Sequence, residues 1–213
     1  MKKIDFKPII ITIGLLIFQA FIYLLTKLLE GDPHIIGNSI DSKIPFSIYA
    51  IIPYCIWYFM LFIVPYIIYK RDKNIFTKYC ISFICITLVS NILFVIYPTT
   101  VANVRPTITG NSILELIARF IFWIDTPPIN CFPSLHCGIS MLWLLYILYI
   151  KQTNIYEKII IPIISILIMI STLCIKQHVF IDLVSGDIIA IIIFTTIIYE
   201  KNLTNKFKKL LNI

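Results

Sequence analysis

From Ser171 to Asp182 the sequence reads STLCIKQHVFID, a short polar stretch between two long apolar runs. The first run is Ile159–Ile175 and the second is Val179–Tyr199. Both approach the length of about 20 residues that a helix needs to cross a bilayer. The stretch is therefore predicted to return the chain at a membrane surface and to hold His178 and Asp182 there.

The composition agrees with a chain embedded in a membrane. Of its 213 residues, 59% are apolar and 14% are charged, whereas soluble domains carry about 45–50% apolar and about 25% charged residues. We predict an all-α fold in a single domain covering residues 1–213: a polytopic membrane bundle of six transmembrane helices. The predicted spans are Ile9–Leu25, Phe46–Tyr69, Tyr79–Tyr97, Cys137–Ile150, Ile159–Ile175 and Val179–Tyr199.

A further apolar segment, Ser112–Trp123, lies between the third and fourth predicted spans. It is predicted to be an interfacial helix, with its aromatic side chains at the level of the lipid headgroups; a short buried helix is the alternative. Glu115 and Arg119 are four residues apart, so they can form an ion pair on the helix surface.

The net charge of +7 is distributed as a membrane topology signal, which argues against a nucleic-acid partner. With six spans, thirteen of the 18 lysines and arginines fall on the side of the two termini. The positive-inside rule then places both termini in the cytoplasm and the polar stretches outside. Abundant isoleucine, lysine and asparagine are typical of an AT-rich bacterial genome and predict a bacterial plasma membrane.

His178 and Asp182 are four residues apart, a spacing that places two side chains on one face of a helix. A carboxylate in an apolar segment is expected to have a partner. Bound to one ring nitrogen of His178, it would leave the other free to attack a substrate. A purely structural hydrogen bond is the alternative. Asp187, deeper in the same run, is predicted to be a structural polar group facing the bundle.

Two further segments lie at the same predicted membrane face. Pro133-Ser134-Leu135-His136 begins the fourth span, where proline suits a first helical turn and serine can cap it. A helix start offers free N–H groups to an anion, so Ser134 could bind phosphate oxygens and His136 could donate a proton; a capped helix with an interfacial histidine is the alternative. Arg105, before Pro106, could bind phosphate through two N–H groups.

Together these residues resemble the type 2 phosphatidic acid phosphatase superfamily of lipid phosphatases and phosphotransferases. Its pattern is Lys-x6-Arg-Pro, Pro-Ser-x-His and Ser-Arg-x5-His-x3-Asp. The resemblance covers residues 97–186. Within them the chain keeps every defined residue of this pattern except two. The family lysine falls at Pro98 and the family arginine at Thr172. These departures, with Tyr97-Pro98-Thr99 and Cys131-Phe132-Pro133-Ser134, resemble the branch that contains inositol phosphorylceramide synthases.

The resemblance implies a mechanism without metal or cofactor, acting on a lipid phosphate or pyrophosphate. His178 would attack phosphorus, Asp182 would orient it, and His136 would protonate the leaving group. Arg105 and Ser134 would bind the phosphoryl oxygens, and Lys176 is expected to supply part of the missing positive charge.

Other functions remain open from the sequence. A phosphotransferase would pass the phospho-headgroup to a lipid or polyol hydroxyl through the same residues. A non-catalytic lipid-binding homologue or a six-span transporter are further alternatives. Cys131, Cys137 and Cys174 lie near the outer face, where two of them could form a disulfide, and no Cys-x-x-Cys or histidine cluster indicates zinc.

Overall fold

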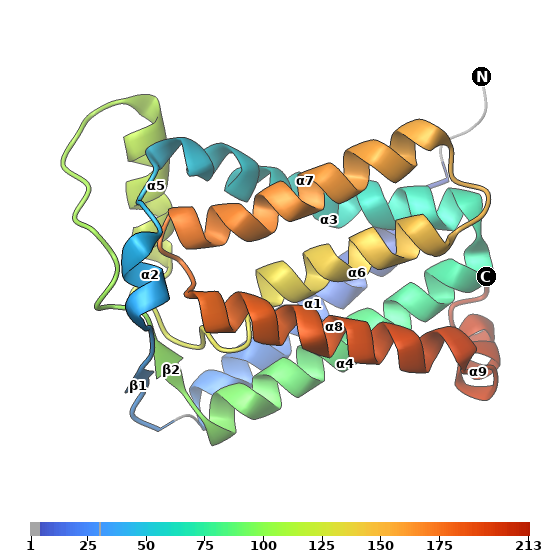
Figure 1. Cartoon of the computed structure of the whole chain (residues 1–213). Helices are drawn as coiled ribbons and strands as arrows, with labels where there is room; N and C mark the ends of the chain where they lie inside the picture. Colours follow the sequence, from blue (N-terminus) through green and yellow to red (C-terminus); the bar gives the residue numbers. More distant parts are fainter. Residues whose placement is uncertain (1–4, 30) are drawn as a thin grey trace.

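The computed structural model describes residues 5–29 and 31–213 as one helical bundle (Figure 1). In these residues five helical segments are long and apolar enough to cross a membrane, as expected for an integral membrane protein. They are α1 (Lys7–Lys27), η1 with α3 (Ile48–Ala50 and Ile51–Arg71), α4 (Lys73–Ile96), α7 (Ile155–Cys174) and α8 (Phe180–Tyr199). The remaining elements are β1 (His34–Ile35), α2 (Ser39–Lys43), β2 (Thr99–Thr100), α5 (Ile113–Ile124), α6 (Leu135–Tyr149) and α9 (Asn202–Leu210).

Each predicted span corresponds to a helix, although two helices begin more than a helical turn earlier than predicted. Helix α7 begins at Ile155 rather than Ile159, and the difference is larger at the third span. The third was expected from Tyr79, but α4 begins at Lys73. The reason is a side-chain cap: Asp72 Oδ1 accepts hydrogen bonds from the N–H groups of Asn74 and Ile75, at 2.8 and 3.0 Å. A capping carboxylate satisfies N–H groups that have no partner inside the helix, so the polar start of α4 is helical.

Helix α6 lies at the centre of the bundle, in contact with α3, α4, α7 and α8. Its Trp143 and Tyr146 are fully buried. Trp143 Nε1 donates to the Tyr79 hydroxyl at 3.1 Å, and the Tyr146 and Ser82 hydroxyls are 2.7 Å apart. Buried polar groups are normally paired in this way.

With 15 residues, α6 is about 22 Å long at 1.5 Å per residue, against a hydrocarbon core of about 30 Å. Its first turn lies inside the end of the bundle that α3 and α7 reach (Figure 1). Leu135 and His136 at this start line a cavity, so the start of α6 is the floor of a recess.

The beginning of α1 and the end of the chain lie at the opposite end of the bundle (Figure 1). Lys7 Nζ donates to the Asn212 carbonyl, and Arg71 forms an ion pair with Glu157 at 2.7 Å, joining the end of α3 to the start of α7. The start of α1 and the end of the chain therefore lie at the same end of the bundle, whereas six transmembrane spans stay a prediction because α6 is shorter than the five candidate spans.

The recessed end is covered by α5, α2 and the pair β1–β2, which runs parallel with His34 opposite Thr99. Helix α5 lies across the bundle direction (Figure 1), and Phe120 and Trp123 on it are exposed; its position in the headgroup region stays a prediction. The ion pair that the spacing of Glu115 and Arg119 allows is not formed among the described residues. Glu115 instead accepts from the Ser112 N–H at 2.8 Å, and Arg119 donates to the Gly110 carbonyl.

Helices α6 and α8 approach closely at two glycines. A Cβ atom on Gly186 would lie 2.4 Å from the Ser134 carbonyl oxygen and 3.3 Å from the Gly138 nitrogen. A Cβ atom on Gly138 would lie 3.0 Å from the Gly186 carbonyl oxygen. The absence of side chains here lets α8 pack against the first turn of α6.

Gly186→Ala is expected to push α8 away from Ser134, since a methyl group has no space there. Overpacking of this kind costs about 1–3 kcal/mol, so the midpoint of thermal unfolding in detergent should fall. The control is Gly14→Ala in α1, where a Cβ atom meets nothing within 4 Å. Equal unfolding midpoints for the two variants would contradict the close packing.

Candidate active site

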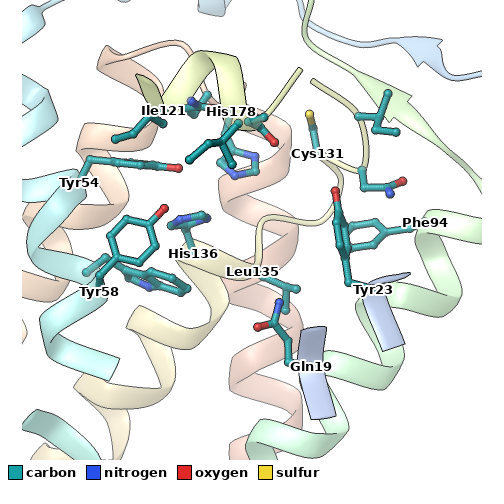
Figure 2. A pocket seen from close by; sticks show the side chains of 16 residues that line it. Gln19, Tyr23, Tyr54, Tyr58, Phe94, Ile121, Cys131, Leu135, His136 and His178 are labelled. Carbon is teal, nitrogen blue, oxygen red and sulfur yellow. The ribbon is translucent and has the colours of Figure 1, made fainter. Parts of the chain in front are cut away.

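A cavity of about 240 Å³ lies at the recessed end of the bundle (Figure 2). His136 from the first turn of α6 and His178 from the α7–α8 junction both line it. Tyr54 and Tyr58 of α3 form one wall, and Tyr23 of α1 lies on the far side of the cavity (Figure 2). The cavity therefore brings together two of the three segments that the sequence singled out.

Asp182 contacts one ring nitrogen of His178 and so fixes the orientation of the ring. Its Oδ2 lies 3.3 Å from His178 Nδ1 and accepts the Val179 N–H at 3.0 Å, and the Asp182 side chain is fully buried. A carboxylate on Nδ1 leaves Nε2 as the ring nitrogen available for reaction. The predicted pairing is present, but the predicted cause, a shared helix face, is wrong. Helix α8 begins at Phe180, so His178 precedes the helix and Asp182 caps its first turn.

The backbone of His178 is fixed by the end of α7. Lys176 has a left-handed conformation, with φ of 59°, and the N–H groups of Gln177 and His178 both donate to the Thr172 carbonyl, at 3.0 and 3.1 Å. The Lys176 N–H donates to the Leu173 carbonyl at 3.1 Å. These bonds form a Schellman motif, in which glycine usually takes the left-handed position. With lysine there, the sequence carries no signal for the turn.

Ser134 is the N-cap of α6, where its Oγ accepts the Cys137 N–H at 3.3 Å. Pro133 precedes the cap rather than lying in the first turn, which corrects the sequence interpretation. The Ser134 N–H donates to the Asp182 carbonyl at 3.0 Å, and the residue is 1% exposed. Ser134 therefore joins α6 to α8 and places His136 opposite His178.

Aromatic rings hold His136 in place. Its ring stacks on Tyr54, with centroids 4.9 Å apart, and lies 4.2 Å from the Trp57 ring. The His136 and His178 centroids are 5.8 Å apart. In the described part of the chain, His136 Nε2 is buried without a hydrogen-bond partner, so it can serve a reacting group. Sequence reasoning missed both aromatic residues, although their three-residue spacing in a span places them on one helix face.

Arg105 contacts Gln177, the residue before His178, on the side away from the cavity lining. Its Nη1 donates to the Asp125 carbonyl at 3.0 Å, while Nη2 donates to Asp125 Oδ2 and to Gln177 Oε1. The guanidinium also lies 5.0 Å above the Phe122 ring. With its side chain 9% exposed, Arg105 belongs to the same cluster as the two histidines, although it lies outside the cavity lining.

A family model described as the PAP2 superfamily matches residues 22–196, which is most of the chain and includes every residue of this cluster. The chain belongs to the PAP2 superfamily. Members of this superfamily are generally phosphoesterases. No curated protein and no solved structure matches the chain significantly.

The two positions where the chain departs from the superfamily pattern have structural roles here. The carbonyl of Pro98 accepts the His34 N–H at 2.9 Å, next to Thr99, whose hydroxyl accepts the Phe132 N–H at 3.0 Å. Thr172 is fully buried and its carbonyl fixes the His178 loop. Neither replacement brings a charge to the cavity.

Lys176 does not compensate from its observed position. Its Nζ donates to the carbonyls of Asp41 and Ile44, at 2.9 and 2.5 Å, and it is not among the residues that line the cavity. Its ammonium group stabilises the chain around α2 instead. Contact with phosphate would require this lysine to leave both carbonyls.

Cys131 lines the cavity, whereas Cys137, Cys174 and Asp187 do not. Cys131, Cys137 and Cys174 are all free, and burial raises the pKa of the Cys131 thiol. Asp187, one residue past Gly186, is half-buried on α8 and does not line the cavity.

The sequence pattern gave no role to Asp41, which lies in the short helix α2. Its Oδ1 accepts the Phe180 N–H at 2.7 Å and its Oδ2 accepts the Asn38 N–H at 2.8 Å. The residue is 3% exposed. Asp41 therefore holds the start of α8, two residues after His178, from the segment between α1 and α3.

Asp41→Ala should leave the Phe180 and Asn38 N–H groups without their partner. An unsatisfied buried donor costs about 1–3 kcal/mol, so we expect a lower unfolding midpoint and lower turnover, because the His178 loop loses its support. Asp32→Ala is the matched control, since Asp32 is an exposed acid in the same segment. An Asp41→Ala variant indistinguishable from this control in both measurements would contradict the assignment.

Proposed function

We propose that this protein is a membrane phosphoric ester hydrolase that removes phosphate from a lipid phosphate or lipid pyrophosphate through a phosphohistidine at His178. The observation that carries the proposal is the His136–His178 pair across one cavity, with the buried Asp182 carboxylate on His178 Nδ1. Two histidines with different partners suit two different roles. His178, bound by a carboxylate, suits the nucleophile. His136, whose Nε2 has no hydrogen-bond partner among the described residues, suits the acid and base.

In the first step, His178 Nε2 attacks phosphorus while the bond from phosphorus to the leaving oxygen breaks. His136 gives its proton to that oxygen, and Asp182 stabilises the positive charge of the phosphorylated ring. In the second step, His136 takes a proton from water as the water oxygen attacks phosphorus. The phosphorus–nitrogen bond then breaks, releasing phosphate and restoring His178. No metal takes part in this scheme.

The start of α6 would bind the phosphoryl oxygens through its N–H groups, and the Arg105 guanidinium would add positive charge from outside the cavity lining. Helix starts favour anions because N–H groups point outward there, and the cap on Ser134 fixes this start. Positioning and electrostatic stabilisation are the main demands of phosphoryl transfer.

A lipid substrate suits a cavity at this depth. Trp57, Leu135 and Phe94 give it apolar walls, and the floor at the start of α6 lies inside the bundle end (Figure 1). A headgroup could reach His178 while its chains stay beside the helices.

The second candidate is phosphotransfer to a lipid or polyol hydroxyl in place of water. The uncharged residues Pro98 and Thr172 favour it, because they resemble the inositol phosphorylceramide synthase-like branch. The chemistry at His178 would be unchanged, and the acceptor alone would differ.

Phosphate release should be measured on purified protein in detergent with a panel of lipid phosphates and pyrophosphates. His178→Ala is expected to abolish release, and His136→Ala to reduce it about 100- to 10,000-fold, the usual contribution of a general acid–base. The control is His34→Ala, since His34 is exposed on β1 and is the chain's one histidine besides His136 and His178.

Loss of activity in the control as well would contradict the assignment of roles. Transfer of phosphate to an added alcohol, without release to water, would favour the second candidate. Neither release nor transfer by the wild-type protein would favour a non-catalytic lipid-binding homologue.

We also propose that both termini face the cytoplasm and that the cavity opens on the extracytoplasmic side of a bacterial plasma membrane. The basic residues Lys70, Arg71 and Lys73 lie where α3 passes into α4, and positive residues favour the cytoplasmic side. A protease-cleavable tag at the C-terminus should be protected from protease added outside intact cells. Cleavage of the tag from outside would contradict this orientation.

A further inference from the structure

Gln177 carries an unused hydrogen-bond donor beside the nucleophile. Its side chain lines the cavity next to His178, and the residue is 3% exposed. Within residues 5–29 and 31–213, its Nε2 is buried and has no hydrogen-bond partner. A buried donor without a partner lowers the stability of the folded protein. A ligand in the cavity that accepts a hydrogen bond from Nε2 would remove this cost.

Arg105 determines which way the Gln177 amide points. Arg105 Nη2 donates to Gln177 Oε1, and an arginine has donors only. The reversed amide would place its own N–H groups against the guanidinium, so the oxygen must face Arg105 and Nε2 must be the free end. The Gln177 backbone is fixed as well, because its N–H donates to the Thr172 carbonyl at 3.0 Å.

Among the described residues, the lining of the cavity holds no lysine or arginine to attract an anion, and it includes the negatively charged Asp125. Pro98 and Thr172 replace the two basic residues of the superfamily pattern, Lys176 is bound to carbonyls of the α2 segment, and Arg105 is paired with Asp125. Arg105 does not line the cavity, whereas Gln177 does. Hydrogen bonds in a chain polarise one another, so the bond from Arg105 strengthens Nε2–H as a donor.

We propose that Gln177 binds a non-bridging oxygen of the phosphoryl group through Nε2–H while that group is transferred to and from His178. Gln177 thereby carries the positive influence of Arg105 into the cavity in place of a lysine or arginine. This inference rests on the proposed function, because it assigns a further phosphate-binding residue to the same site.

The test uses orthovanadate, a phosphate analogue, with two variants that both lack the donor. They differ in whether an oxygen faces Arg105. Gln177→Glu keeps an oxygen for Arg105 but has no donor, and Gln177→Met lacks both. We expect the vanadate concentration for half-inhibition of phosphate release to rise about 10- to 100-fold in both, the range for losing a hydrogen bond to a charged group. Because the glutamate also adds a negative charge that repels vanadate, the uncharged Gln177→Met variant decides the test. A residue with only a structural role would lower the unfolding midpoint of Gln177→Met and leave its sensitivity to vanadate at the wild-type value.

Gln152→Glu and Gln152→Met are the matched controls, since Gln152 is exposed in the turn after α6. Both should keep the wild-type sensitivity to vanadate. Thermal unfolding with and without vanadate supplies a second readout that requires no turnover. We expect vanadate to raise the midpoint of the wild-type protein and of the controls, but not that of either Gln177 variant.

Wild-type sensitivity to vanadate in either Gln177 variant would overturn the inference. So would a wild-type protein whose activity and unfolding midpoint do not change when vanadate is added. A wild-type protein that vanadate stabilises through Gln177, but that releases no phosphate, would contradict the hydrolase function and leave the binding role of Gln177 in place. The two failures are therefore distinguishable.

Discussion

Asp182 is the residue on which the arrangement of the site depends. Its buried carboxylate binds the His178 ring and the Val179 N–H, and its carbonyl accepts the Ser134 N–H. One residue in the first turn of α8 thus sets the position of His178 and the start of α6, where His136 lies. The close packing of Gly186 on the Ser134 carbonyl makes these bonds possible, because a larger residue would separate the two helix starts.

The remaining elements support this junction from outside. Asp41 and Lys176 join the segment between α1 and α3 to the α7–α8 turn, and the Thr99 hydroxyl holds the chain that leads to Ser134 through the Phe132 N–H. These contacts lie at the end of the bundle, over a central helix that is shorter than its neighbours. A short α6 produces the recess, and the loops around it place polar groups there without exposing them to the apolar sides of the bundle.

The sequence predicts what depends on local pattern. Apolar runs predicted α1, α3, α4, α6, α7 and α8 but not α2 or α9, and motif spacing singled out His136, His178, Asp182 and Arg105. The His178–Asp182 pair was predicted for the wrong reason. Its spacing was attributed to a shared helix face, but α8 begins at Phe180, two residues after His178. The rest depends on contacts between distant segments, or on residues with no distinctive pattern. Asp41 and Phe180 are 139 positions apart, and Lys176 takes a turn position where glycine would have been the signal.

The central claim is that His178 becomes covalently phosphorylated, and the most direct test is to find that phosphate. Purified protein would be incubated briefly with a lipid phosphate labelled in the phosphate group, denatured in alkali, which preserves phosphohistidine, and digested for mass spectrometry. Label on the peptide containing His178, absent in His178→Ala, is the result that the account predicts. Phosphate released by the wild-type protein with no labelled histidine at any reaction time, or with the label on His136, would contradict it.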